Sequence, residues 1–370
     1  MLINTDMITQ TRLINQRISA VKRSMNPEDT VFTMGAIQAQ DYQAALWAIG
    51  LRCKEGTTKS DVESAIASKK IIRTWLMRGT IHFASSSDIL QMLQLFGPRL
   101  IKTGKLRDSH LGLSPEIIEK VESLFSKALE GGNQLKRSEM YKIMEKGGVP
   151  HSNNIGYHML YRAAWDGIIC FGLHEGKEAT FSLLEDSTPK QYKFDREKAL
   201  KDLAIRYFNS HGPATLEDYV WWSGLKVSDA KLGMEMVKSR LSAEEAGGKT
   251  YYMPRETAKS KETAQSLFLL PAFDEYIISY KDRSQLLDNA NTQKWLRSGK
   301  VAFIHSNGVF LPTIVIEGKV VGTWRRELRK GKLEIILNQF AKISQEHRKL
   351  ISDEAERYGR FFEIDAKLKT

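Results

Sequence analysis

The strongest constraint on the fold is an order of secondary-structure signals in the middle of the chain. Three segments with helical spacing of apolar residues, about 195–210, 215–222 and 229–241, precede the alternating stretch EEAGGKTYYM. Thr215 is followed three positions later by Asp218, an approximate capping box at the start of the second segment. Gly-Gly within the alternating stretch predicts the tip of a short hairpin. Three helices followed by a hairpin are the order of a winged helix-turn-helix.

A second copy of this order occupies about residues 114–187. Ser114 is expected to cap a helix that has Pro115 at its first position, and Ser138 is expected to cap a second helix, EMYKIMEK. NIGYHMLYRAAW follows as a third helix, and IICFGLHEGKEATFSLL alternates like two strands around a turn. The two copies share an order of elements without residue identity, so they predict a structural repeat.

The two ends of the chain show related and different patterns. The first 110 residues are expected to contain helices at about 6–23, 27–35 and 43–51, a helix DVESAIASK, the strand pair IIRTWLMRGTIHFAS and a helix DILQMLQLFGPRLIKTG. From about residue 264 three stretches alternate like strands, with hairpin signals at Asn307-Gly308 and Glu317-Gly318-Lys319, before a charged helix at about 341–359.

These patterns predict an α+β protein of four consecutive domains. Three tandem winged helix-turn-helix domains are expected at 1–112, 113–190 and 191–256. A small C-terminal antiparallel β-barrel, or a curled sheet, with a final helix is expected at 257–370.

Charge and composition limit the partners. The chain has 55 Lys and Arg against 44 Asp and Glu, a formal net charge of +11, which points to a polyanionic partner, with a generic basic surface as the alternative. Cys53 and Cys170 lie far apart, and neither a CxxC pair nor an HExxH motif occurs, so we expect no bound metal and no cofactor. No apolar run approaches the roughly 20 residues of a membrane span, and the N-terminus is polar, so we expect a cytoplasmic protein.

Five segments of the chain, taken in order, carry a resemblance to one known protein family. They are GAIQAQDY with ALWAIGLR (35–52), TWLMRGTIHF (74–83), HGPATLEDYVWWSGL (211–225), LLPAFDEYIISYKDRS (269–284) and NGVFLPTIVIEGKVVGTWRR (307–326). Over nearly its whole length the sequence resembles the AlkZ/YcaQ winged-helix superfamily. The resemblance implies three winged helices, a small β-barrel and glycosylase activity in DNA repair.

That superfamily divides at one tripeptide. One branch carries Gln-apolar-Gln and the other Gln-apolar-Asp, and Gln38-Ala39-Gln40 resembles the first, AlkZ-like branch. The resemblance implies that Gln38 and Gln40 are catalytic. By its spacing alone the tripeptide is a weak motif, and two exposed glutamines in a linker are the alternative.

The chemistry of base excision suits two amides. A glycosylase exposes the damaged nucleotide and then breaks its N-glycosidic bond through an oxocarbenium-like transition state. A purine alkylated at N7 already carries positive charge and leaves readily, so a glutamine carbonyl that orients water and faces a cation is sufficient, although glutamine is no general base. Residues i and i+2 share a side in extended backbone but diverge on a continuous helix, so we predict a non-helical or helix-terminal stretch with Gln38 and Gln40 on one side and Ala39 on the other.

Three carboxylates are rival candidates for acid or base chemistry. Asp41 adjoins the tripeptide, but we expect it to cap the following helix. Asp274 and Glu275 resemble an acid/base pair, but we expect a structural role for them, for instance an ion pair with Arg283 or Arg325.

A second constellation of candidate residues lies in the strand pair near residue 75. On one strand Arg78, Thr80 and His82 would share a face, where they would contact a phosphate or the substrate. The alternative is a structural role in a stabilising wing, with the arginine in an ion pair. Arg73 is a further candidate for DNA contact. Trp75 offers either a base-stacking platform or, as we favour, core packing.

Two further groups of residues are candidates for DNA contact or for structural roles. Arg325 and Arg326 begin a basic cluster near a hairpin end, which contacts the DNA backbone or forms a solvated face. Trp221 and Trp222 are expected in the core of a winged helix.

The leading hypothesis is a monofunctional DNA glycosylase, acting as a monomer on double-stranded DNA, that hydrolyses cationic N7-alkylpurine adducts. The resemblance implies bulky adducts or interstrand crosslinks as substrates. No lysine nucleophile is indicated, so the expected product is an abasic site. The alternative from another class is a non-catalytic winged-helix transcriptional regulator that binds DNA through phosphate contacts.

Overall fold

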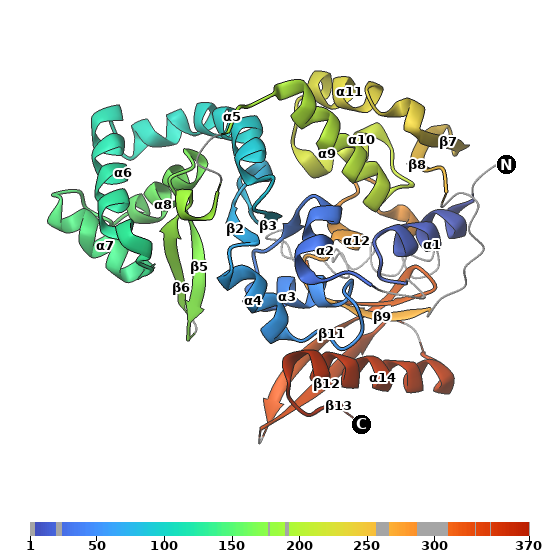
Figure 1. Ribbon diagram of the computed structural model, residues 1–370. Helices are drawn as coiled ribbons and strands as arrows, with labels where there is room; N and C mark the ends of the chain where they lie inside the picture. Colours follow the sequence, from blue (N-terminus) through green and yellow to red (C-terminus); the bar gives the residue numbers. More distant parts are fainter. Residues whose placement is uncertain are drawn as a thin grey trace. The chain divides into compact units, whose positions relative to one another are not determined.

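The structure is a computed structural model that describes residues 4–19, 24–176, 178–188, 192–256, 266–286, 310–329, 331–340 and 342–369. The chain forms two compact units (Figure 1): unit 1 consists of Met1–Val62 and Leu200–Thr370, and unit 2 of Glu63–Ala199. Both contain helices and sheet, which confirms the α+β class. This division into two units is coarser than the four consecutive domains expected from the sequence. The four-domain organisation therefore stays a prediction.

Unit 2 combines a sheet with long helices. Its elements are the end of α4 (Lys59–Ala67), β2 (Ile71–Trp75), β3 (Ile81–Ser85), α5 (Ile89–His110), α6 (Pro115–Leu129), β4 (Leu135–Lys136), α7 (Arg137–Lys146), α8 (Ile155–Trp165), β5 (Ile169–Glu175), β6 (Glu178–Leu183) and the start of α9 (Arg196–His211). Its strands follow the order β3–β2–β5–β6–β4. The strand pair and the second helix–hairpin order predicted from the sequence are therefore both present.

Two predicted caps in unit 2 had different outcomes. Ser114 caps α6 as expected, with its hydroxyl accepting the N–H of Ile117 and Pro115 at the first helical position. The prediction for Ser138 is wrong, because α7 begins at Arg137 and Lys136 occupies the cap position, two residues earlier than expected. The Glu139 carboxylate accepts the N–H of Lys136 at 2.7 Å and fixes that start.

Unit 1 brings both ends of the chain together with the region after residue 200. Its helices are α1 (Thr5–Asn15), α2 (Pro27–Met34), α3 (Tyr42–Gly50), the start of α4, most of α9, α10 (Leu216–Ser223), α11 (Val227–Glu235), α12 (Glu275–Ile278) and α14 (Gln345–Phe362). Its strands are β1 (Ile37–Gln38), β7 (Leu241–Ala246), β8 (Lys249–Pro254), β9 (Leu267–Leu270), β10 (Thr313–Ile316), β11 (Lys319–Arg329), β12 (Lys332–Gln339) and β13 (Ala366–Leu368).

The helix–helix–helix–hairpin order expected between residues 195 and 255 is present as α9, α10, α11 and the β7–β8 pair. Thr215 and Asp218 form the predicted capping box, in which each side chain accepts the other residue's backbone N–H. The third helix was predicted too long. It ends at Glu235, and Leu241 is already the first residue of β7.

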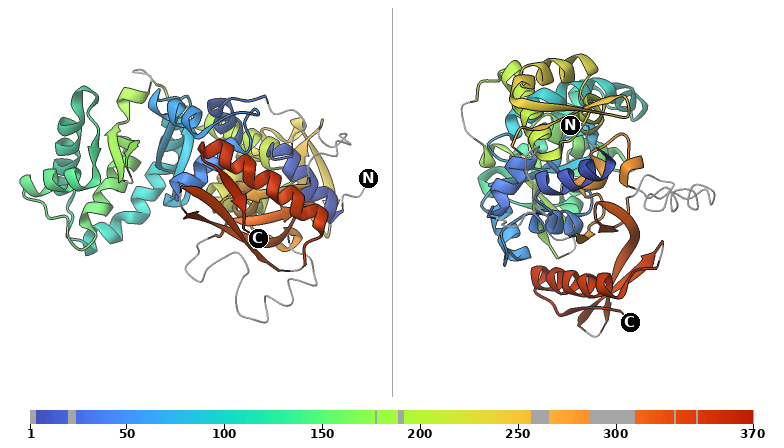
Figure 2. Two further views of the ribbon diagram at one scale, coloured as in Figure 1. Left: turned by 90° about the horizontal axis from the view of Figure 1, so that it is seen from below. Right: turned by 90° about the vertical axis from the view of Figure 1, so that its right-hand side faces the viewer.

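The C-terminal sheet runs in the order β13–β12–β11–β10–β9 and curls beside α14 (Figure 2). Glu317 and Gly318 have φ values of +49° and +81°, which makes the predicted tight turn between β10 and β11. Of the two predicted forms, a small barrel or a curled sheet, the described residues form the curled sheet, with β9 and β13 at its edges. Asn307-Gly308 lies outside the described residues. The first of the three stretches expected to alternate like strands spans residues 266–284, but its middle forms the helical turn α12, since Asp274 accepts the N–H of Tyr276 and caps it.

Two buried tryptophans attach β9 to its neighbours. The indole N–H of Trp47 on α3 donates to the carbonyl of Leu269, and that of Trp324 on β11 donates to the carbonyl of Leu270, both at 2.9 Å. Trp47 also packs on Tyr358 of α14, with ring centroids 5.2 Å apart. These contacts fix the chain just before the turn that carries Asp274 and Glu275. They thereby help to position Glu275, which contacts the segment of Gln38.

Candidate functional site

The Gln38-Ala39-Gln40 tripeptide joins β1 to α3 and is not helical, as predicted. Ala39 is fully buried, whereas Gln38 is half-buried and Gln40 is exposed. This alternation places the two amide-bearing residues on the open side of an extended segment. Gly35, which precedes the segment, has a φ of +79°, and a Cβ there would lie 3.4 Å from Trp222, so glycine suits this close turn.

Asp41 has the role expected from the sequence. Its carboxylate accepts the backbone N–H of Ala44 at 3.0 Å and caps α3. A carboxylate that caps a helix is a weaker candidate for a general base than an uncommitted one, because one of its oxygens already accepts a backbone N–H.

A buried carboxylate lies directly against the tripeptide. The Glu275 side chain is fully buried and accepts the backbone N–H of Gln38 at 2.7 Å. It also accepts the indole N–H of Trp222 at 3.0 Å and the hydroxyl of Ser279 at 2.5 Å. The sequence did not predict the contact with Gln38, because the two residues are 237 positions apart. The expectation that Glu275 is structural rather than a free acid/base group agrees with its complete enclosure.

The same enclosure sets the protonation of Glu275 and His211. Burial alone would raise the pKa of the Glu275 carboxyl, but neighbouring His211, the Ser279 hydroxyl and the Gln38 N–H outweigh burial and lower it to about 2. His211 is also fully buried, and burial lowers the pKa of its imidazole below the ordinary value of 6.5. The site therefore contains an ionised carboxylate beside a neutral imidazole at pH 7.

We predict that Glu275 makes stability depend on pH in the acid range. Because folding lowers its pKa from 4.5 to about 2, the stabilisation is present above pH 4.5 and is lost as the pH falls towards 2. At pH 7 Glu275→Gln should lose at most about 3 kcal/mol of unfolding free energy. Urea unfolding of both proteins from pH 7 to pH 3 measures the difference, which should shrink below pH 4.5. A difference that stays constant over that range contradicts the assignment.

Asp274 has a different partner from the two predicted. Its carboxylate forms a two-point ion pair with Arg52, at 2.8 and 2.9 Å, and both side chains are fully buried. Arg52 also donates to the Ala48 carbonyl at 2.8 Å and to the Gln16 side chain at 2.9 Å. The expected pairing with Arg283 or Arg325 is therefore wrong. The ion pair attaches the turn that carries Glu275 to α3, the helix that follows the tripeptide.

Arg78, Thr80 and His82 do not share a strand face, so that prediction is wrong. Arg78 lies in the tight turn Met77–Gly79 between β2 and β3, with a φ of +57°, and Thr80 precedes β3. Arg78 is exposed, whereas His82 on β3 is fully buried and donates from Nδ1 to the carbonyl of Thr80 at 2.9 Å. The left-handed turn at Arg78 and Gly79 breaks the alternation on which the prediction depended.

Arg73 and Trp75 are buried side chains of β2 in unit 2. The guanidinium of Arg73 stacks 4.5 Å from the Phe171 ring and donates to His174 at 3.2 Å. Trp75 is 3% exposed and packs against Phe171, with ring centroids 4.5 Å apart. Its enclosure in an aromatic cluster favours core packing over the alternative of base stacking.

Arg325 and Arg326 are exposed neighbours on β11, so their side chains project from opposite faces of the sheet. Arg325 forms an ion pair with Glu327, which also pairs with Arg329. Arg326 instead donates to the hydroxyl of Tyr358 on α14. The cluster presents positive charge near the end of the β11–β12 hairpin, partly offset by Glu327.

The two tryptophans of α10 differ in burial. Trp222 is buried, as predicted, and donates to Glu275. The prediction for Trp221 is wrong: it is 44% exposed, and its indole N–H donates to the carbonyl of Ile278 at 3.0 Å while Arg283 lies 5.2 Å from its ring. Adjacent helical residues point about 100° apart, so only one of the pair faces the core.

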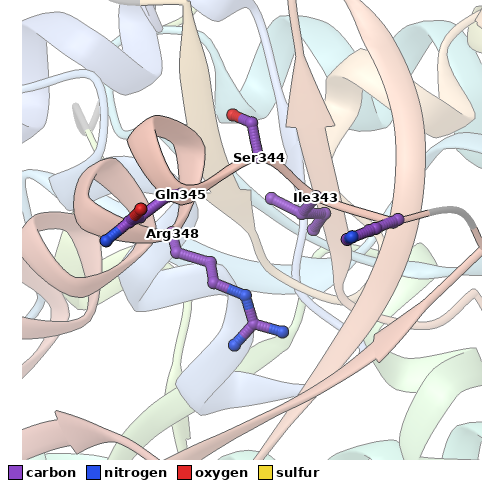
Figure 3. Close-up of a pocket in the computed structure, with 5 residues that line it drawn as sticks. Ile343, Ser344, Gln345 and Arg348 are labelled. Atoms are coloured by element: carbon purple, nitrogen blue, oxygen red, sulfur yellow. The ribbon is translucent and has the colours of Figure 1, made fainter.

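A pocket at the start of α14 is separate from the tripeptide. Lys342, Ile343, Ser344, Gln345 and Arg348 line it (Figure 3), and none of the candidate residues does. Ser344 is the helix cap, with its hydroxyl accepting the N–H of His347. Within the described ranges no cluster of three or more His, Cys, Asp or Glu side chains suits a metal ion, and no helix is long and apolar enough to cross a membrane.

Comparison with known proteins identifies the family. The family model for DNA glycosylase AlkZ-like proteins matches residues 31–361. The interstrand DNA cross-link repair glycosylase of Streptomyces sahachiroi is 24% identical over 311 residues, which cover 80% of this chain and 81% of that protein. The solved structure of the Streptomyces sahachiroi DNA glycosylase AlkZ superimposes with a TM-score of 0.77 at 20% identity, over 100% of both chains. The chain described here belongs to the AlkZ-like family of DNA glycosylases.

Proposed function

We propose that Gln38 and Gln40 form the catalytic site of this DNA glycosylase and that its substrates are purines made cationic by alkylation at N7. The observation that carries the proposal is the extended tripeptide, which places two neutral amides on an open side and buries Ala39 behind them. The nearby carboxylates are already engaged, Asp41 as a helix cap and Glu275 in an enclosed set of hydrogen bonds.

The proposed reaction needs no strong acid or base from the protein. As the bond between the sugar and the cationic purine lengthens, the base leaves as a neutral molecule and the sugar becomes an oxocarbenium-like cation. The carbonyl oxygens of the two glutamines stabilise that cation and orient a water molecule towards the anomeric carbon. Addition of water and loss of a proton to solvent give an abasic site, so the enzyme is proposed to be monofunctional.

Bulky adducts and interstrand crosslinks are the proposed biological substrates. The relative from Streptomyces sahachiroi is named for cross-link repair, and an exposed Gln40 fits a site that accepts a large lesion. Membership of a glycosylase family decides against the non-catalytic transcriptional regulator considered from the sequence.

Double-stranded DNA is the proposed form of the substrate. The net charge of +11 supports binding to a polyanion, and exposed Arg78, Arg325 and Arg326 are proposed to contact its phosphates. We also infer that α6–β6 and α9–β8 are two winged-helix domains, from their order of helices and hairpin, and that a third lies in the first 112 residues. A cytoplasmic monomer fits this role.

Base release measures the proposed activity directly. Duplex DNA with a single N7-methylguanine is incubated with excess enzyme, and free base and alkali-labile abasic sites are quantified. The proposal expects both products in equal amounts, with strand cleavage only after alkali treatment. DNA binding without release of base contradicts it, and strand cleavage without alkali contradicts the monofunctional assignment.

A further inference from the structure

The surroundings of Glu275 leave its negative charge without a cationic hydrogen-bond partner among the described residues. All three hydrogen-bond donors are neutral: the Gln38 backbone, the Trp222 indole and the Ser279 hydroxyl. The nearby imidazole of His211 is neutral at pH 7, and its Nε2 lies 3.7 Å from the carboxylate, beyond hydrogen-bond distance. The buried guanidinium of Arg52 forms its ion pair with Asp274, the residue next to Glu275 in the sequence.

Burying a charge without a neighbouring cation costs free energy of folding. Such a charge is therefore more readily explained by a role in function than by stability. Neutral donors stabilise the carboxylate by their dipoles but leave its net charge in place. This charge lies 2.7 Å from the backbone nitrogen of Gln38, directly behind the segment that carries the two catalytic glutamines.

We propose that Glu275 is a positioning residue with a second, electrostatic effect: it holds the Gln38 backbone and supplies the fixed negative charge that favours the cationic sugar of the transition state. The inference rests on the proposed function, since it requires the reacting sugar to lie at Gln38 and Gln40. Glu275 itself is fully enclosed by protein groups and acts through the tripeptide.

The expected size of the effect follows from distance. A sugar in contact with a glutamine side chain of the tripeptide lies on the order of 8–10 Å from the carboxylate. At an effective dielectric constant of about 20, one unit charge at that separation favours a cation roughly tenfold or somewhat more. The effect is smaller than that of a direct contact but is available without reorganisation during the reaction.

The test uses two abasic-site analogues that differ in charge. One duplex carries a pyrrolidine nucleotide, a cation at neutral pH, and the other carries neutral tetrahydrofuran at the same position. The wild type should bind the pyrrolidine duplex about tenfold more tightly, as expected for a transition-state mimic. Glu275→Gln keeps an oxygen that accepts the Gln38 N–H but removes the charge, so this preference should largely disappear while affinity for tetrahydrofuran is retained.

The matched control is Glu354→Gln. Among the described glutamates only Glu275 and Glu354 are buried, and Glu354 lies on α14, where it accepts a hydrogen bond from Arg357. This control should keep the wild-type preference for the cation. The ratio of two affinities from one preparation does not depend on the folded fraction, so a partly unfolded variant still reports on charge.

Each outcome decides the proposal. Loss of the preference in Glu275→Gln but not in Glu354→Gln supports it, and an unchanged preference in Glu275→Gln overturns it. If Glu275→Gln does not fold, the wild type alone still tests the proposal. A wild type that binds the pyrrolidine duplex no more tightly than the tetrahydrofuran duplex also overturns it. A wild type that releases no alkylated base refutes the proposed function instead, so the two failures are distinguishable.

Discussion

Gln40→Ala and Gln38→Ala should each reduce the rate of base release from N7-methylguanine DNA by about 100-fold or more. The reason is that each substitution removes one of two amides proposed to orient water and to face the sugar cation. Gln40 is exposed, so its replacement should leave the fold and the affinity for undamaged DNA unchanged. Single-turnover rates with enzyme in excess measure the loss without interference from product release.

The neighbouring residue supplies the matched control. Asp41→Asn removes a carboxylate next to Gln40 but keeps a side chain that caps α3 through the N–H of Ala44. This variant should release base at close to the wild-type rate. If Asp41→Asn instead abolishes release and Gln40→Ala does not, Asp41 is the catalytic group and the assignment of the glutamines is wrong.

Arg52→Met should lower the free energy of unfolding of unit 1 by about 3–5 kcal/mol. Both partners of the Arg52–Asp274 ion pair are fully buried, so removal of the arginine leaves the Asp274 carboxylate enclosed with its backbone hydrogen bond from Tyr276 and no cation. The Gln16 side chain and the Ala48 carbonyl also lose a donor. Urea or thermal unfolding at pH 7 measures the change.

Two further variants show that the loss comes from the stranded charge. The double variant Arg52→Met with Asp274→Leu removes both charges and should lose less stability than the sum of the two single changes. Lys238→Met removes a lysine from an exposed ion pair with Glu235, and it should cost at most about 1 kcal/mol. Equal losses for Arg52→Met and Lys238→Met would contradict a special role of the buried pair.

Local signals predicted most of the fold, because capping and periodicity act within a few residues. The capping box at Thr215 and Asp218, the cap at Ser114 and the turn at Glu317-Gly318 are all present. The errors occur where a short-range effect competes with periodicity. Asp274 caps a helical turn inside an apolar stretch that was expected to be a strand.

The candidate site was predictable only in part. The extended geometry at Gln38-Ala39-Gln40 follows from the alternation of polar and small apolar residues, and the Asp41 cap from its position before α3. Glu275 and Arg52 gain their roles from partners more than 200 positions away, which no local pattern reveals. The turn at Arg78 has a positive φ that breaks the strand alternation assumed for Thr80 and His82.

The central claim is that two amides suffice because the leaving base carries its own positive charge. The most direct measurement compares single-turnover base release by the wild type from two matched duplexes, one with cationic N7-methylguanine and one with neutral O6-methylguanine. The account predicts release of the N7-alkylated base and release of the neutral base slower by at least about 1,000-fold, a barrier difference of about 4 kcal/mol. Comparable rates for the two bases would contradict it and would require a strong acid or base at the site.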